Sequence, residues 1–298
     1  MCPLRGVLVS AAAPFIAVDW GTTNRRAYRI ENGEVVATER DDRGILAVPA
    51  GGFPALVAEL RVRFDGLPVV MAGMVGSNRG WHDAGYVACA ATIEALAAGV
   101  VTPEEGVAIV PGVCVDTKSR ADVMRGEEVQ LLGAVAAGLA PADALLCQPG
   151  THNKWAVMKH GAIAGFTTAM TGEMFALLKA HALIGSEMAG EVDAGADFRQ
   201  GVEACADTDL LAALFGVRAA SVLGHRAPGA AAAYVSGLLI GSDCRARIAP
   251  GQQVHLLADG LLADLYSAAI TIAGGEAVVV DSKASFVAGI TRIRSLLP

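Results

Sequence analysis

The sequence predicts an α/β protein made of two related half-domains. Three observations lead to this expectation: the chain has 298 residues, one polar hairpin occurs twice, and apolar strands alternate with helical patterns. A chain of this length exceeds a typical single hydrophobic core. Alternating strands and helices favour sheets covered by helices. We therefore expect two α/β half-domains with a ligand cleft between them.

The first polar hairpin starts at residue 15. An apolar strand, Phe15 to Val18, runs into Asp19, and a turn rich in glycine and hydroxyl groups follows, formed by Gly21, Thr22, Thr23 and Asn24. Asn32-Gly33 then marks a two-residue hairpin turn. Backbone N–H and hydroxyl groups in such a turn suit phosphate oxygens. Asp19 at the strand end can hold Mg²⁺, directly or through water.

The second hairpin repeats the first at a constant offset of 129 positions. After an apolar strand, its turn contains Gly150, Thr151, His152, Asn153 and Lys154. Gln148 stands where the first copy has Asp19, so only one copy carries a carboxylate. One such hairpin alone could be an ordinary turn. Two copies in matched context indicate two half-domains that clasp one polyphosphate, with the terminal phosphate and metal at the first hairpin.

The composition limits the classes of partner and the cellular compartment that we expect for this protein. The formal net charge of −7 gives no basic field for nucleic acid, and no run reaches the ~18 apolar residues of a membrane span. The six cysteines are scattered without a C-x-x-C pair, which favours a reduced, cytoplasmic protein. The hydrophobic fraction of 53% is compatible with a homodimer. Residues 5–13 resemble a short signal peptide, but Pro14 and the phosphate strand follow at once, so we expect residues 1–14 to be a loose leader rather than an export signal.

A glycine-rich loop follows the strand predicted at 68–72, after a helix predicted over 53–63. Ligands of open α/β sheets gather beyond the carboxyl ends of strands. The polar and aromatic residues of this loop suit a polyhydroxy carboxylate, with a guanidinium for the carboxylate and an indole for the sugar face. The candidate residues are Gly76, Ser77, Asn78, Arg79 and Trp81. An ordinary surface loop is the alternative.

The remaining pattern places the half-domain boundary near Ala140. A strand over 107–115, interrupted by Pro111-Gly112, precedes a helix that runs to about Ala137. Beyond the second hairpin, a helix starts near Met174, and residues 198–224 and 230–241 read as helices. Thr171 and Gly172 could bind phosphate at a helix N-terminus or simply cap it. A strand over 253–257, a turn at Gly260 with its helix, a strand over 276–280 and a last helix complete the chain.

These motifs together resemble a known superfamily. The paired hairpins resemble the phosphate motifs of sugar kinases, Hsp70 and actin, whose half-domains have the actin-like (ribonuclease H-like) α/β fold. Within it, the chain resembles the 2-dehydro-3-deoxygalactonokinase family. The matching runs cover residues 17–24, 72–77 with 80–81, 122–128, 149–155 and 170–178. The resemblance extends from about Phe15 to the end and divides the chain into a sugar- and phosphate-binding domain, 15–140, and a nucleotide-binding domain, 141–298.

The resemblance implies the chemistry. The chain would transfer the γ-phosphate of ATP, with Mg²⁺, to the 6-hydroxyl of 2-dehydro-3-deoxy-D-galactonate. Lys154 would contact the inner phosphates, and Gly260 would lie near adenosine, although Ala258 stands where the family pattern has its glycine. Arg25 and Arg26 point to opposite faces of a strand, so at most one enters the site.

The catalytic base is a choice between two carboxylates, with Glu128 as a third choice. Superfamily kinases use an aspartate just before the second hairpin, which Asp122 fits by type and region. Glu127 fits by its position at a helix start, where the dipole favours an anion. We prefer Asp122; capping or an ion pair with Arg125 is the structural alternative for either. The alternative functions are a polyphosphate or nucleotide phosphatase, which would use water in place of the sugar, and a non-catalytic ATP-binding switch.

Overall fold

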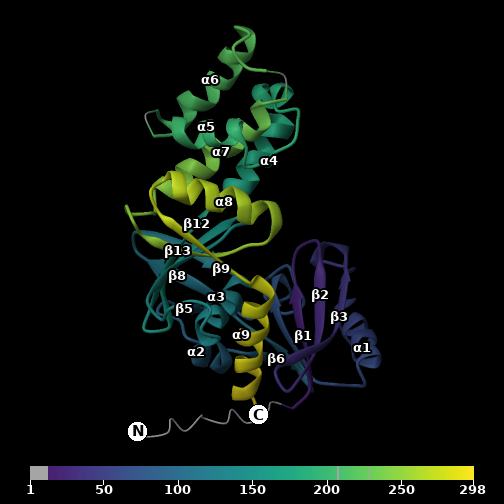
Figure 1. The fold of residues 1–298 in the computed structure, drawn as a ribbon. Helices are drawn as coiled ribbons and strands as arrows, with labels where there is room; N and C mark the ends of the chain where they lie inside the picture. Colours follow the sequence, from purple (N-terminus) through teal and green to yellow (C-terminus); the bar gives the residue numbers. More distant parts are fainter. Residues whose placement is uncertain (1–12, 207, 228) are drawn as a thin grey trace, which may run out of the picture.

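The computed structural model describes residues 13–206, 208–227 and 229–298. The strands of these ranges form a six-stranded, a five-stranded and a three-stranded sheet, which helices cover (Figure 1). This confirms the expected α/β class. The first twelve residues of the expected leader lie outside the described residues. None of the helices in the described ranges is both long and apolar enough to cross a lipid bilayer.

The six-stranded sheet comes from the first half of the chain and has the order β3-β2-β1-β4-β7-β6. Strand β1 pairs antiparallel with β2 and parallel with β4. Asn32 and Gly33 have φ angles of 52° and 82°, as the two-residue hairpin turn requires. The strands are β1 (Phe15–Trp20), β2 (Arg25–Glu31), β3 (Glu34–Asp41), β4 (Val69–Gly73), β6 (Val101–Glu104) and β7 (Val107–Ile109).

The five-stranded sheet repeats this arrangement in the order β12-β11-β10-β13-β14. Strand β10 pairs antiparallel with β11 and parallel with β13, as β1 does with β2 and β4. The repeat confirms that the two polar hairpins belong to equivalent positions of two related sheets. The strands are β10 (Ala144–Gln148), β11 (Asn153–Lys159), β12 (Ala162–Ala169), β13 (Gln253–Leu257) and β14 (Glu276–Val280).

The three-stranded sheet was not expected. It contains β5 (Tyr86–Ala88), β8 (Gly112–Thr117) and β9 (Arg120–Met124), in the order β5-β8-β9. The prediction of one strand over 107–115 is wrong, because β7 and β8 belong to different sheets. Pro111 lies between them and has no N–H to continue a ladder. Asp122 belongs to β9 of this small sheet and precedes the helix that begins at Glu127.

The last helix returns to the first half of the chain. Helix α9 (Ser282–Leu296) packs against α3 (Glu127–Ala136), α2 (Ile93–Ala98) and β1, and Figure 1 shows it beside β1. The α3 and α9 backbones are in contact, because a Cβ atom on Gly133 would lie 1.9 Å from the Ser285 carbonyl oxygen. One core cluster includes Phe15, Leu146 and Phe286, from both sheets and α9. The division at Ala140 separates the two large sheets in sequence and remains our proposal.

The other helices cover the sheets or extend beyond them. Helix α1 (Phe53–Arg63) matches the predicted helix, and α8 (Gly260–Ile272) packs on β13 and β14. Helices α4 (Thr171–His181), α5 (Ala196–Ala204), α6 (Leu210–Val222) and α7 (Ala231–Arg245) form the far end of the molecule, at the top of Figure 1. Residues 198–224 hold two helices instead of one, because the Asp209 carboxylate accepts the Ala212 N–H at 3.0 Å and starts α6.

Candidate active site

Backbone hydrogen bonds from residues 44–46 hold the first hairpin turn in place. The N–H groups of Gly44, Ile45 and Leu46 donate to carbonyl oxygens of the turn at 3.0–3.2 Å. A Cβ atom on Gly44 would lie 2.3 Å from the Thr22 carbonyl oxygen, so only glycine permits this approach. Thr22 and Thr23 are exposed. The turn therefore has its carbonyl groups satisfied by the protein, while its hydroxyl groups face solvent, as a phosphate ligand needs.

Asp19 lies at the end of β1 beside this turn. Arg26 Nη1 is 3.8 Å from Asp19 Oδ2. Arg25 points the other way: it is buried, pairs with Asp41 at 2.5 Å and lies 5.0 Å from the Trp20 ring centroid. The two arginines thus point to opposite faces of the strand, as expected from the sequence. Burial raises the pKa of Asp19, Arg26 lowers it, and the nearby charge of Glu127 raises it further.

The second hairpin turn is locked to the start of α4. The Glu173 N–H donates to the Thr151 carbonyl oxygen at 3.0 Å, and Glu173 Oε2 lies 2.6 Å from His152 Nε2. A Cβ atom on Gly172 would lie 2.4 Å from the Gly150 carbonyl oxygen. Thr151 and His152 are exposed. The predicted loop and the predicted helix start are therefore one structural unit.

The equivalent asparagines of the two hairpins differ. Asn24 is exposed, whereas Asn153 is fully buried. Its Oδ1 accepts the Gly150 N–H at 2.9 Å, and its Nδ2 donates to Asp243 Oδ2 at 2.7 Å. Thr171 is also buried and donates to the same Asp243 oxygen at 3.0 Å. In this structure Asn153 and Thr171 shape the hairpin from inside.

Lys154 joins the second hairpin to the first half of the chain. Its buried ammonium group lies 3.1 Å from Thr168 Oγ1, 3.3 Å from the Val123 carbonyl oxygen and 3.8 Å from Glu127 Oε1. Lys154 therefore pairs with the glutamate at the start of α3.

The start of α3 packs tightly against the ends of β1 and β4. Gly126 has a φ of 107°, and a Cβ atom there would lie 3.1 Å from the Gly73 Cα atom. A Cβ atom on Gly73 would in turn lie 2.8 Å from the Trp20 carbonyl oxygen. Only glycine at both positions lets three segments meet, which brings Glu127 to the strand end that carries Asp19.

The two glutamates at this helix start have different environments. Glu127 is partly exposed, and its Oε2 accepts the Arg125 N–H at 3.0 Å. Glu128 is fully buried, and its carboxylate accepts the Gly126 N–H at 2.7–2.8 Å. Burial, together with the charge of Glu127, raises the pKa of Glu128 to about 8.

Asp122 has a different set of contacts. Its two oxygens accept the Thr168 hydroxyl at 2.6 Å and the Thr168 N–H at 2.8 Å. Arg120 Nη2 lies 3.1 Å from the same carboxylate. The side chain of Asp122 thus connects β9 to β12 and is only 12% exposed.

Some of the predicted residues of the candidate substrate loop are buried and others are exposed. Gly76 and Ser77 are buried, and Ser77 Oγ donates to the Met74 carbonyl oxygen at 2.7 Å. Trp81 stacks on Phe53, with ring centroids 6.3 Å apart. Asn78 and Arg79 are exposed. The loop thus exposes the side chains of Asn78 and Arg79, and its indole is partly used in packing.

Arg125 lies under this loop, and sequence reasoning considered it only as an ion-pair partner. Its guanidinium is buried, donates to the Gly85 carbonyl oxygen at 3.0 Å and lies 4.3 Å from the Tyr86 ring centroid. A Cβ atom on Gly76 would lie 3.1 Å from Arg125 Nη1. Among the described residues, Arg125 is the only side chain with two buried nitrogens, Nε and Nη1, that lack a hydrogen-bond partner. Asp83 is its nearest carboxylate, at 3.7 Å.

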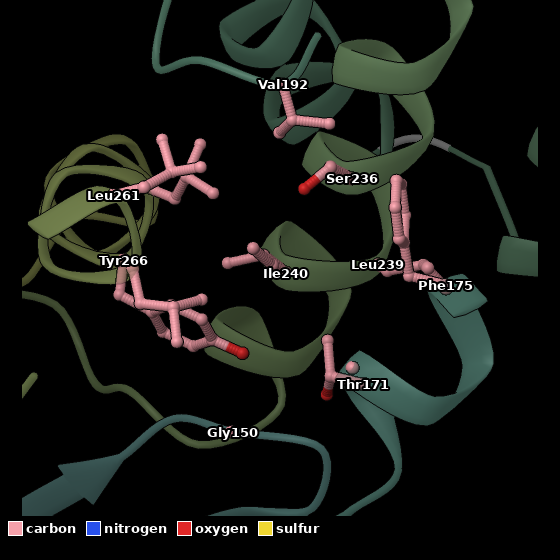
Figure 2. Close-up of a pocket in the computed structure, with 12 residues that line it drawn as sticks. Gly150, Thr171, Phe175, Val192, Ser236, Leu239, Ile240, Leu261 and Tyr266 are labelled. Carbon is pink, nitrogen blue, oxygen red and sulfur yellow. The ribbon is translucent and has the colours of Figure 1, made fainter. Parts of the chain in front are cut away.

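A largely apolar cavity of about 300 Å³ lies against the second hairpin. Gly150 and Thr171 border it at one end, and Tyr266 and Leu261 of α8 form a wall, with Ile240 and Leu239 of α7 behind (Figure 2). The predicted contact Gly260 does not line it; the next two residues, Leu261 and Leu262, do.

The described residues contain no group of three or more His, Cys, Asp or Glu side chains that could hold a metal ion alone. A divalent ion at Asp19 would need further oxygens from phosphate and water. Mg²⁺ is commonly bound in this way, by one or two carboxylates with substrate phosphates. The geometry around Asp19 therefore fits a metal that arrives with a phosphate ligand.

Comparisons with known proteins bear on the family to which the chain belongs. The family model for 2-keto-3-deoxy-galactonokinase matches residues 19–293. A 2-dehydro-3-deoxygalactonokinase of Escherichia coli (strain K12) is 36% identical over 287 residues, which cover 94% of this chain and 97% of that protein.

Solved structures give the same result. A crystal structure described as a putative 2-dehydro-3-deoxygalactonokinase protein from Sinorhizobium meliloti superposes with a TM-score of 0.87, at 33% identity, covering 94% of this chain and 97% of that chain. An activator of 2-hydroxyisocaproyl-CoA dehydratase from Clostridium difficile, solved with bound ADPNP, has a TM-score of 0.51 at 13% identity, covering 95% and 94%. The latter likeness shows the fold alone. The family match and the long, well-covered relatives establish that the chain belongs to the 2-keto-3-deoxy-galactonokinase family.

Proposed function

We propose that the protein transfers the γ-phosphate of ATP to the 6-hydroxyl of 2-dehydro-3-deoxy-D-galactonate, giving the 6-phosphate. The observation that carries this proposal is the position of Glu127: it lies 3.8 Å from Lys154 of the second hairpin, at a helix start that packs against the end of the strand that carries Asp19. Phosphoryl transfer requires positioning, charge neutralisation and a base near the accepting hydroxyl. Asp19 could hold the metal, Lys154 could neutralise charge and Glu127 could act as the base. The identity of the sugar acid is taken from the names of the relatives.

The nucleotide would lie in the second half of the chain. The cavity beside Gly150 has the volume and apolar lining that suit a purine, and its inner end opens on the second hairpin. Helix N-termini offer backbone N–H donors to anions, and the N-terminus of α4 is fixed to that hairpin. Adenosine in the cavity and phosphates at Gly150, Thr151, His152 and Gly172 are therefore mutually consistent positions.

Mg²⁺ would be held at Asp19, at the end of β1. When bound, the ion would neutralise charge on the transferred phosphoryl group. The exposed hydroxyl groups of Thr22 and Thr23 would contact the terminal phosphate. The partly exposed Arg26, near Asp19, adds a positive charge to the same side of the site.

Glu127 is the better candidate for the base. Both oxygens of Asp122 accept hydrogen bonds from Thr168, and Arg120 lies 3.1 Å from the same carboxylate, so this side chain is held between two strands. Glu127 is partly exposed, and its Oε2 accepts a hydrogen bond from a backbone N–H, that of Arg125. It also lies 3.8 Å from Lys154, at the helix start that packs against the end of the strand that carries Asp19, where we expect a hydroxyl to approach the terminal phosphate.

The sugar acid would bind at the loop that follows β4. Its carboxylate needs a cationic partner, and two arginines lie there: Arg79, exposed, and Arg125, buried. Burying a guanidinium with two donors unpaired costs free energy unless a ligand satisfies them. We infer that the substrate carboxylate pairs with Arg125 after the loop opens, displacing the distant contact with Asp83, while Asn78 and Arg79 contact hydroxyl groups.

Product analysis tests the position of transfer. We expect a ³¹P–¹H correlation spectrum of the product to couple the phosphate to the C6 protons of the sugar acid. Coupling to protons of another carbon would contradict the proposed acceptor and leave the kinase class intact. Release of inorganic phosphate without a phosphorylated sugar would contradict the kinase itself.

A further inference from the structure

One buried carboxylate, Asp243, gathers the elements that surround the second hairpin. It lies on α7 and is only 6% exposed. A single oxygen, Oδ2, accepts hydrogen bonds from Asn153 Nδ2 at 2.7 Å, Thr171 Oγ1 at 3.0 Å and Trp155 Nε1 at 3.2 Å. These donors come from β11 and from the start of α4, which are the two segments that form the hairpin unit.

The contact with Asn153 sets the shape of the turn. An asparagine amide has one donor end and one acceptor end. Because its donor end faces Asp243, its oxygen faces the turn and accepts the Gly150 N–H at 2.9 Å. A carboxylate accepts without donating at neutral pH, so Asp243 permits one amide orientation only. The geometry of Gly150 therefore depends on a side chain that lies 90 positions after Asn153 in the sequence.

The same network reaches the wall of the cavity. Asn153 Nδ2 also contacts the Tyr266 hydroxyl of α8, and both Tyr266 and Thr171 line the cavity. Figure 2 shows these two side chains on opposite walls, with Gly150 below them. A ligand that contacts Tyr266 or Thr171 thus touches groups bonded to Asp243 or to its partner Asn153.

Packing alone does not explain a charge at this place. Asp243 pairs with Arg247, whose Nη1 lies 2.8 Å from Oδ1. Burying such a pair costs desolvation free energy, and apolar residues of similar size often serve stability as well or better. We explain the charge of Asp243 by the side chains that it orients, Asn153 and Thr171.

We propose that Asp243 is a positioning residue for nucleotide binding: it fixes the second hairpin through Asn153 and links that hairpin to the cavity wall through Thr171 and Tyr266. This inference rests on the proposed function only in naming ATP as the ligand. Asp243 itself touches neither substrate nor the reacting atoms. Its loss weakens nucleotide binding and leaves the sugar-acid site, which lies in the other half, unchanged.

The test compares Asp243→Asn with Val254→Ala. Val254 is fully buried in β13 and does not line the cavity, so its truncation destabilises the same half without touching the network. ADPNP binding is measured by calorimetry on each full-length variant, together with KM for ATP and for the sugar acid and the urea midpoint. We expect Asp243→Asn to weaken ADPNP binding by about 10–100-fold, the usual range for a lost charge-assisted hydrogen bond, with an unchanged KM for the sugar acid. Val254→Ala should lower the urea midpoint and bind ADPNP normally.

A double variant identifies the path. If Asp243 acts through Asn153, the pair Asp243→Asn with Asn153→Ala binds ADPNP no more weakly than the worse single variant. Asp243→Glu, which keeps the charge, should recover part of the affinity. The inference is overturned if Asp243→Asn lowers the urea midpoint as Val254→Ala does and leaves ADPNP binding unchanged. Failure of the wild-type protein to bind ADPNP would instead reject the proposed function from which the ligand was taken.

Discussion

Asp122 and Thr168 bind each other through two hydrogen bonds, at 2.6 Å from the hydroxyl and 2.8 Å from the N–H. The pair joins β9 of the small sheet to β12 of the second large sheet. Arg120, two residues before Asp122, also contacts the Phe166 carbonyl oxygen and the Thr167 hydroxyl. Asp122 therefore has a structural task at the junction of the two halves, and this supports our proposal of Glu127 as the base.

Glu127→Gln and Asp122→Asn are therefore expected to differ in kind. Loss of a general base lowers kcat by about 10²–10⁴-fold, so Glu127→Gln should lose that much with little change in the free energy of unfolding. Asp122→Asn should lose about 1 kcal/mol of stability, the usual net worth of a hydrogen bond, and keep most of its kcat. Steady-state kinetics and urea unfolding measure both. The reverse pattern would restore Asp122 as the base.

Asp19→Asn is expected to change the response to magnesium. Removing the carboxylate should raise the Mg²⁺ concentration for half-maximal activity by about 10–100-fold, as changes around metal ligands typically do. Arg26→Gln is the matched control, because it removes the neighbouring charge and keeps the carboxylate. Titration of activity with Mg²⁺ at fixed total ATP measures the effect. An unchanged midpoint in Asp19→Asn would place the metal elsewhere.

Arg125 and Arg79 can be separated with two substrates, the sugar acid and its C1 amide. If Arg125 pairs with the carboxylate, Arg125→Met should raise KM for the acid by about 10–100-fold and leave KM for the amide near the wild-type value. Arg79→Met should retain the preference for the acid. Loss of that preference in Arg79→Met alone would move carboxylate recognition to the exposed arginine. Circular dichroism confirms that both variants are folded.

The buried Glu128 predicts a dependence of stability on pH. Its pKa is about 8 in the folded protein because of burial and the charge of Glu127, against an ordinary value of 4.5. Between these values the folded state keeps a proton that the unfolded chain releases, so the free energy of unfolding falls as pH rises. The stabilisation is complete below about pH 4.5 and lost above about pH 8, at a slope approaching 1.4 kcal/mol per pH unit.

Glu128→Gln removes this titration and keeps the shape of the side chain. Urea unfolding at several pH values between 5 and 9 should show a flatter profile for Glu128→Gln than for the wild-type protein. Glu94→Gln, an exposed glutamate, is the control and should follow the wild-type profile. Parallel profiles for Glu128→Gln and wild type would mean that Glu128 ionises freely in the folded protein.

Local pattern was sufficient for the hairpins and most strands. Short apolar runs bounded by turn residues, such as Phe15–Val18, predict buried strands. The Asn32-Gly33 turn was predictable from its requirement for positive φ. The offset between the two hairpins also predicted two equivalent sheets, which the structure confirms.

Contacts between segments that are far apart in the sequence could not be predicted from local pattern. Asp122 bonds to Thr168 across 46 positions, and Asn153 bonds to Asp243 across 90. Neither partner carries a local signal, so the burial of Asn153 and the structural task of Asp122 were not predictable. The return of α9 to the first half depends on backbone contact at Gly133 and Gly289, which looks like an ordinary pair of helical glycines in sequence.

The most direct test of the proposed kinase is coupled ADP release by the purified protein with Mg-ATP. The reaction is run with 2-dehydro-3-deoxygalactonate, with its gluconate epimer and without sugar. We predict ADP release only when a sugar acid is present, and the ratio between the epimers measures substrate preference. Equal release without sugar would contradict the kinase and indicate a phosphatase. No release from a protein that still binds ATP would indicate a switch.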